Sequence, residues 1–370
     1  MTWLARVVVL LSLWIGLPLL GAWLAGRSIE PYLEFPPVPT PGEPTSFSWV
    51  YFAVTAFLIV VVLGPFIWRV LSVQSRVPVR QPPARGFPVW GWLGIGFLAV
   101  AWILAWTRFP WFAELQPYTF TPLWLGYVIV INALTWQRTG ACMMTHRTGY
   151  WLALFLVSTV FWWLFEYLNL FAQNWYYTGE RKTPSPAYFF SSSLSFATVL
   201  PAVLGTRDWL ASFPRLTAGL HDFWQPPLPP SQWLAWILLL LGAISLFGIG
   251  LRPEQFYPML WLAPLFLLLS LEIRAGRPTL LDAPRRGDWT PLWLGALAAL
   301  VCGFFWEMWN NGNLSQWHYV VPYVDRFRIF HMPLLGYSGY LPFGLTCIAA
   351  ADFFLPQVSS RPANERRLAR

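Results

Sequence analysis

The sequence predicts an all-α protein that crosses a membrane many times. Of its 370 residues, 56% are hydrophobic and only 11% are charged, whereas a soluble domain carries about 25% charged residues. Apolar runs close to the length of a membrane span recur along the whole chain. We therefore predict a polytopic transmembrane helix bundle of about ten spans, in which two parallel four-helix repeats follow two lead-in helices.

Ten apolar segments approach the roughly 17–25 residues that one span requires. The fourth is short, and Pro201 interrupts the sixth. The first also resembles a signal peptide, but its apolar run is long for one and no small-residue cleavage site follows, which favours a retained anchor. The predicted spans are Leu4–Trp23, Trp49–Leu71, Val89–Trp106, Pro122–Trp136, Tyr150–Leu170, Tyr188–Leu204, Trp233–Gly250, Tyr257–Ile273, Pro291–Asn310 and Pro333–Phe354.

The basic residues predict the orientation of these spans. If the N-terminus is cytoplasmic, 17 of the 24 Lys and Arg residues lie on the inner side, as the positive-inside rule requires. We therefore predict a multi-pass protein of the cell inner membrane with both termini in the cytoplasm. The net charge of +8 then indicates contact with anionic lipid headgroups rather than nucleic acid, because no DNA- or RNA-binding motif accompanies it. Protein partners stay open.

A five-residue pattern occurs twice, each time at the outer end of a predicted span. Residues 165–169 read Phe-Glu-Tyr-Leu-Asn, and residues 306–310 read Trp-Glu-Met-Trp-Asn. An aromatic segment follows each copy, and Trp124 matches Trp261 at a similar offset. Because each unit then holds four spans, an even number, we predict two parallel repeats related by an axis along the membrane normal.

The repeats divide the chain into five segments. Residues 1–88 hold two lead-in helices and a basic cytoplasmic loop. Residues 89–205 hold the first four-helix repeat, and residues 232–355 hold the second. A cytoplasmic linker spans 206–231, and a basic cytoplasmic tail spans 356–370. No segment is long enough to form a separate core outside the membrane.

The Glu-x-x-Asn spacing places polar side chains on one face of each helix. Residues three apart on a helix are neighbours, so Glu166 lies with Asn169 and Glu307 lies with Asn310. A carboxyl group near hydrocarbon is costly, and a partly desolvated one can act as a proton donor or acceptor. We predict Glu307 and Glu166 as catalytic residues. The alternative is that each glutamate hydrogen-bonds a loop amide or reaches the membrane surface.

Aromatic residues after each glutamate complete the predicted site. Trp175, Tyr177, Trp317 and Tyr319 belong either to an aromatic belt at the headgroups, which is the expected pattern, or to a wall around an apolar or cationic ligand. We assign them, together with the two asparagines, as substrate-binding residues.

The segment 329–343 is the most unusual in the chain, because two Pro and two Gly residues enter an apolar helix there. Such a break is tolerated in a bilayer only where protein or water satisfies the freed backbone groups. It predicts either a simple kink or the lip of a site to which the titratable His331 contributes as a substrate-binding residue. A metal-ligand spacing is absent, so no metal and no cofactor are predicted.

Other ionisable or reactive residues have simpler explanations. Glu272 and Asp352 fall at the inner ends of predicted helices, where contact with lipid headgroups is a sufficient explanation. The three cysteines are odd in number and form no Cys-x-x-Cys motif, which argues against a disulfide framework.

Two resemblances rest on motifs of this chain. In Trp306-Glu307-Met308-Trp309-Asn310, Trp317-His318-Tyr319 and Met332-Pro333-Leu334-Leu335-Gly336-Tyr337, the C-terminal part resembles a group of uncharacterised bacterial polytopic membrane proteins. This resemblance implies no function.

A second pattern is Glu166 with Tyr177, and Glu307 with Tyr319, Pro333 and Pro342. It carries a fainter resemblance to membrane carotenoid hydratases and heteromeric lycopene cyclases, which place a Glu on a helix, then a Tyr-rich turn, then prolines on the next helix. The resemblance implies proton-driven chemistry on a polyene or isoprenoid with Glu as the acid, although Leu334 and Leu335 stand where the cyclases have acids.

Three classes of function fit these features. The first is a membrane-embedded enzyme that acts on an isoprenoid or other lipid by acid–base chemistry at a Glu/Asn/aromatic site toward the outer side. The second is a small-molecule or lipid transporter, which the internal repeat favours. The third is a scaffold or accessory subunit without catalysis, which the many Trp residues and the sparse polar core favour. The sequence alone leaves open whether the protein is an enzyme.

The orientation is testable by cysteine labelling in a background without the native cysteines. We expect a membrane-impermeant thiol reagent to leave Arg80→Cys unmodified in intact cells, because residues 76–88 then form an inner loop. Labelling after permeabilisation is the positive control. Modification of Arg80→Cys from outside intact cells contradicts the orientation.

Overall fold

The computed structural model describes residues 2–43, 46–78, 85–179 and 185–355. Within these residues the chain forms thirteen α-helices and two small antiparallel sheets. The predicted tail 356–370 and the labelling position Arg80 lie outside them. The helices are α1 Trp3–Leu24, α2 Trp49–Val73, α3 Val89–Trp106, α4 Phe120–Thr139, α5 Met143–His146, α6 Thr148–Ala172, α7 Pro186–Phe196, α8 Val199–Leu210, α9 Ser231–Leu251, α10 Pro253–Phe256, α11 Ala263–Arg274, α12 Thr290–Gly312 and α13 Tyr340–Phe354. The strands are β1 Trp175–Thr178, β2 Gln316–Tyr319, β3 Arg328–Ile329 and β4 Met332–Pro333.

The fold is the predicted all-α polytopic bundle. Nine helices of the described residues are long and apolar enough to cross a membrane, and one bent pair brings the number up to ten. The third predicted span, Val89–Trp106, has the bounds of α3. The fourth, predicted as Pro122–Trp136, extends at both ends to form α4. The protein is therefore an integral membrane protein.

The sixth span is broken, but the break precedes Pro201. α7 ends at Phe196 and α8 begins at Val199, so Pro201 lies in the first turn of α8, where its missing N–H breaks no helical hydrogen bond. Ser158 of α6 satisfies the backbone at the break. Its hydroxyl donates to the Phe196 carbonyl over 2.6 Å and accepts from the Leu200 N–H over 3.0 Å. Such partners permit irregular backbone at membrane depth.

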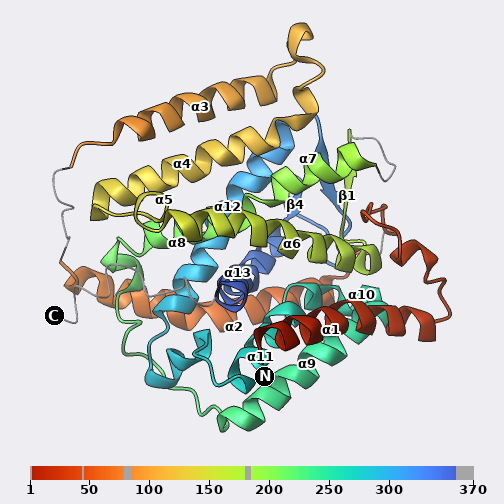
Figure 1. The fold of residues 1–370 in the computed structure, drawn as a ribbon. Coiled ribbons are helices and arrows are strands. Elements are labelled where there is room, and N and C mark those ends of the chain that lie inside the picture. The colour runs from red at the N-terminus through yellow and green to blue at the C-terminus, as the bar shows by residue number, and fades with distance from the viewer. Residues whose placement is uncertain (1, 44–45, 79–84, 180–184, 356–370) are drawn as a thin grey trace.

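The bundle consists of a central group of helices with one further group on each side. α3 packs on α4 along one edge of the bundle, and α9 packs on α1 and α11 along the opposite edge, with α6, α8, α12 and α13 between them (Figure 1). The eighth span bends by 53° where residues 253–260 meet α11. α2 stays peripheral, and none of its apolar stretch is buried inside the bundle.

The first helix is an integral part of the bundle, because α1 and α9 touch backbone to backbone. A Cβ atom at Gly21 would collide with the Phe247 carbonyl oxygen, and one at Gly250 would collide with the Pro18 carbonyl oxygen. Small residues permit this close crossing, as they do at other helix contacts in membranes.

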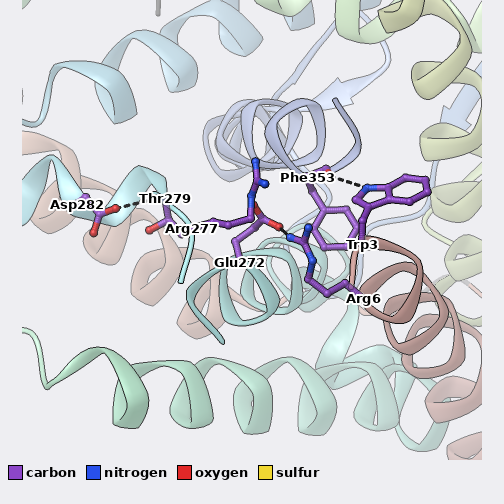
Figure 2. A network of polar contacts seen from close by, with 7 residues as sticks. All are labelled: Trp3, Arg6, Glu272, Arg277, Thr279, Asp282 and Phe353. Atoms are coloured by element: carbon purple, nitrogen blue, oxygen red, sulfur yellow. Dashed lines mark hydrogen bonds and ion pairs between the residues drawn. The ribbon is translucent and has the colours of Figure 1, made fainter. Parts of the chain in front are cut away.

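A buried ion pair also ties α1 to α11 (Figure 2). Arg6 of α1 pairs with Glu272 near the end of α11, and Arg277 in the following loop donates to the second Glu272 oxygen over 2.7 Å. Arg6 and Glu272 are only 4% and 5% exposed. The expectation that Glu272 contacts lipid headgroups is therefore wrong, because it is the counter-charge of a buried arginine.

Removal of this counter-charge should destabilise the fold. We expect Glu272→Gln to lower the free energy of unfolding by about 3–5 kcal/mol, because it leaves Arg6 buried without a charged partner. Thermal unfolding in detergent measures the effect. Asp325→Asn, which breaks an exposed pair with Arg328, is the control and should cost less than about 1 kcal/mol. Equal losses in the two variants contradict this role of Glu272.

Candidate functional site

Both predicted glutamates are fully buried near the ends of long helices. Glu166 lies in the last two turns of α6 and Glu307 in the last two turns of α12, and neither side chain reaches solvent. Asn169 and Asn310 are equally buried. A buried carboxyl group is costly unless hydrogen bonds satisfy it, so the partners of these two groups define the site.

Each asparagine holds the strand that follows its helix. The Asn169 amide donates to the Trp175 carbonyl over 2.7 Å and accepts from the Asn174 N–H over 2.8 Å. The Asn310 amide donates to the Trp317 carbonyl over 2.7 Å and accepts from the N–H of the same residue over 2.8 Å. The asparagines therefore fix β1 and β2 against the ends of α6 and α12.

Strands β1 and β2 form an antiparallel pair that joins the two halves of the chain. Trp175 pairs with Tyr319, Tyr176 with His318, and Tyr177 with Trp317. Alternate residues of a strand point to opposite faces. One face therefore carries the four predicted aromatic residues, and the other carries Tyr176 and His318.

Three neutral donors converge on one oxygen of Glu166. The Trp162 indole nitrogen lies 2.8 Å from Oε1, the Trp175 indole nitrogen 3.2 Å and the Tyr177 hydroxyl 2.5 Å. Trp162 belongs to the same helix, whereas the other two belong to β1. An indole N–H only donates, whereas a phenol both donates and accepts, so a single one of these three groups, Tyr177, can pass on a proton.

Two phenols converge on one oxygen of Glu307. The Tyr319 hydroxyl lies 2.7 Å from Oε1 and the Tyr340 hydroxyl 2.6 Å. The Trp317 indole donates in turn to the Tyr319 oxygen over 2.7 Å. The second carboxyl oxygen, Oε2, is buried and has no hydrogen-bond partner among the described residues. Tyr340, the first residue of α13, is absent from the sequence-predicted site.

The phenols of β1 and β2 keep their protons at neutral pH. Burial raises the pKa of Tyr177 and of Tyr319 well above the usual 10.0, and the adjacent carboxyl group of Glu166 or Glu307 raises it further. A phenolate beside a carboxylate would put two negative charges into one buried site. Both phenols therefore donate hydrogen bonds to their glutamates.

A cavity of about 120 Å³ lies against these phenols. All four predicted aromatic residues line it, and so does Tyr340, so that the phenols separate the carboxyl groups from the cavity. Trp306 stacks on Tyr340 with ring centroids 5.8 Å apart, and Trp175 stacks on Trp261 at the same distance. The described lining residues are Pro117, Phe120, Trp162, Trp175, Tyr177, Tyr188, Ser192, Ser195, Phe196, Val199, Trp261, Trp306, Ser315, Trp317, Tyr319, Met332, Gly336, Gly339 and Tyr340.

His331 lies apart from the carboxyl groups. Its ring packs against His318 with centroids 4.6 Å apart, and His318 projects from the strand face opposite to Trp317 and Tyr319. The neighbouring Met332 lines the cavity. In the part of the chain that the structure describes, no three His, Cys, Asp or Glu side chains form a group that could hold a metal ion.

One sequence offset relates several positions in the two halves of the site, and it is one residue longer for the aromatic strands. The two glutamates are 141 residues apart, and so are Pro201 and Pro342. The same offset matches Val199 with Tyr340, and both of these residues line the cavity. Tyr340 therefore had a sequence signal, because it directly precedes the second of two matching Leu-Pro pairs, at the start of α13.

The histidine pair predicts a loss of stability in acid. Burial lowers the pKa of His318 and of His331, so the unfolded chain binds protons more readily than the folded one near the ordinary histidine pKa of about 6.5. Stability from this pair is present above that pH and is lost as the pH falls through the lowered values. We expect the midpoint of thermal unfolding to fall between about pH 7.5 and about pH 5.5, and less so in His331→Phe. An unchanged pH dependence in His331→Phe contradicts this origin, and His146→Phe is the matched control.

Comparisons of the chain with protein-family models, with curated proteins and with solved structures found no match. The candidate site is therefore described by its own geometry: two buried carboxyl groups, each held by an aromatic strand, flank one cavity whose walls include the phenols that they bind.

Proposed function

We propose that this integral membrane protein is an enzyme that moves a proton between Glu307 and an apolar ligand, an isoprenoid or other lipid, whose end group occupies the aromatic cavity. One observation carries the proposal. Tyr319 and Tyr340 each donate to Glu307 and each line the cavity. If Glu307 is protonated and the O–H of one phenol turns toward the cavity, that phenol can give its proton to a ligand and take the carboxyl proton in its place, as general acid catalysis requires.

The size and chemistry of the cavity support an end group as ligand. A dry apolar cavity of about 150 Å³ in another protein holds benzene, so about 120 Å³ suits a few carbon atoms rather than a whole lipid chain. Aromatic rings dominate the described lining, which fits an apolar group. The resemblance to carotenoid hydratases and lycopene cyclases agrees with a branched polyene or isoprenoid end.

Glu166 takes a different part in this proposal. Two of the donors to Glu166, Trp162 and Trp175, are indoles that hold a carboxylate in place but relay no proton. Tyr177 connects Glu166 to the cavity. We assign Glu307 with Tyr319 and Tyr340 as the acid, and Glu166 with Tyr177 as the group that accepts a proton from the ligand. Asn169 and Asn310 act as positioning residues.

The two halves of the site are further proposed to come from duplication into parallel four-helix repeats, at 89–205 and 232–355. The 141-residue offset supports this, and so do matching ring contacts. The ring centroids of Trp124 and Trp306 lie 5.0 Å apart, and those of Trp261 and Phe165 lie 5.7 Å apart. The second contact repeats the first with the two halves exchanged. An experimental structure in which a rotation about the membrane normal fails to superpose Glu166 on Glu307 contradicts the duplication.

The orientation belongs to the same proposal. With both termini in the cytoplasm, as the basic residues favour, the ends of α6 and α12 that carry the glutamates lie toward the outer side of the inner membrane. The ligand then reaches the site from the outer half of the bilayer.

Transport is the second candidate, and the broken spans favour it. α7 lines the cavity directly before residues 197–198, where the α-helix of the sixth span is interrupted ahead of α8. Transporters built from repeats place their ligands between the halves, next to discontinuous helices. A transporter releases its ligand unchanged, which separates it from an enzyme in the experiment below.

Trapping of the ligand tests the proposed function. We expect Glu307→Gln in native nanodiscs to retain a lipid by mass spectrometry, and the wild type to convert that captured lipid when the two are mixed. Conversion should fall about 100-fold or more in Glu307→Gln and in Tyr340→Phe, because the acid or its relay is lost. Thermal stability should stay near that of the wild type.

Tyr176→Phe is the matched control, because Tyr176 lies on the other face of the strand that carries Tyr177. It should convert the captured lipid at the wild-type rate. A captured lipid that the wild type leaves unchanged contradicts catalysis and favours transport. If Glu307→Gln unfolds with no selective effect on the ligand, the glutamate has a structural role.

A further inference from the structure

We infer that the cavity binds a compact, branched group that carries a positive charge. This inference shares its cavity with the proposed function but does not require that the protein be an enzyme. Two observations lead to it. The described lining residues include none of Lys, Arg and His, but they include nine Trp and Tyr side chains. Behind two of those side chains lies Glu307, which is fully buried.

The first observation concerns the aromatic faces. A cation over the face of Trp or Tyr within about 6 Å is attracted by the ring quadrupole, most strongly where water is excluded. Elsewhere in this protein arginines fill that role: Arg138 lies 3.6 Å from the Phe213 centroid, and Arg274 lies 4.1 Å from the Trp236 centroid. Among the described residues, no arginine stacks in this way on a ring that lines the cavity.

The second observation concerns charge balance. The hydrogen-bond donors of Glu307 are two neutral phenols, and within the described part of the chain it forms no ion pair. An ionised carboxyl group at this depth needs an opposite charge nearby. Only a phenol hydroxyl group of Tyr319 or Tyr340 lies between the cavity and the Glu307 carboxyl group. A cation in the cavity would therefore meet both the aromatic faces and an otherwise unmatched negative charge.

The positive charge can arise in two ways with the same final arrangement. A ligand can bring it, as a quaternary ammonium group does, while Glu307 is ionised. Alternatively, the proton of Glu307 passes through a phenol to one carbon of a ligand alkene. The π electrons form the new C–H bond, the other carbon becomes a tertiary cation, and Glu307 becomes a carboxylate. In both cases a branched cation faces aromatic rings and a carboxylate, and the total charge is conserved.

The volume of the cavity suits both sources equally. A trimethylammonium group and the branched end of an isoprenoid have nearly the same size and shape, and each matches a cavity of about 120 Å³. A cation site of this size therefore selects for charge and branching together, not for chain length.

Choline and its neutral isostere, in which carbon replaces the quaternary nitrogen, provide the test. We expect choline to bind the full-length protein in nanodiscs, by calorimetry, about 10- to 30-fold more tightly than the isostere, as a desolvated cation–π contact predicts. Glu307→Gln should remove most of this preference and leave binding of the isostere unchanged. If Glu307→Gln does not fold, Tyr340→Phe replaces it in the test. This variant keeps the aromatic ring and removes one of the hydroxyl groups that donate to Glu307. Tyr176→Phe should match the wild type.

The outcomes separate this inference from the proposed function. Equal binding of choline and its isostere, or binding of neither, overturns the cation site, even where conversion of the captured lipid continues. A clear preference for choline supports the site, even where no lipid is converted. If choline also competes with conversion of the captured lipid, the charge is one formed during the reaction. If a quaternary amine instead co-purifies with the protein, the ligand itself brings the charge.

Discussion

The free-energy cost of burying two carboxyl groups in a membrane-spanning bundle determines how the rest of this site is built. Glu166 and Glu307 are both fully buried, and hydrocarbon offers them no water. Each group therefore needs donors at fixed positions, and most of those donors come from the strand that follows its own helix. The strand in turn needs a fixed distance from the helix end, which Asn169 and Asn310 provide through paired bonds to its backbone. The antiparallel pairing of β1 with β2 then joins the two arrangements into one wall.

The halves share this plan but differ in what surrounds each carboxyl group. The 141-residue offset matches Trp162 with Gly303 and Val199 with Tyr340. A Cβ atom at Gly303 would collide with the Tyr340 ring, so the glycine is what allows the second phenol to reach Glu307. In the first half a valine stands where that phenol would be, and the Trp162 indole donates instead. The exchange of these two positions thus replaces an indole donor at Glu166 by a phenol donor at Glu307.

Much of the fold followed from the sequence, because membrane spans are long and continuous in their apolar character. Val89–Trp106 was predicted with its observed bounds. The glutamates and the aromatic residues of β1 and β2 were found because they repeat within short windows, although their strand conformation was not predicted. Tyr340 was missed because it lies 33 residues from Glu307, beyond β2, β3 and β4. Only the matching Leu-Pro pairs at the 141-residue offset indicate it. The partner of Glu272 was missed for a similar reason, because Arg6 lies 266 residues away and only helix packing brings the two charges together.

The starts of two helices also lie at the cavity. α8 begins at Val199 and α13 begins at Tyr340, and both residues line the cavity. The start of α13 lies next to Glu307, because Tyr340 donates to its carboxyl group. An ionised Glu307 therefore has two O–H donors already in place. Donors fixed in this way need little reorganisation when charge develops beside them. Glu166 also has indole donors, from Trp162 and Trp175, which can hold an ionised carboxyl group but cannot accept its proton. The two halves therefore place chemically different carboxyl groups beside one cavity, which two identical halves would not do.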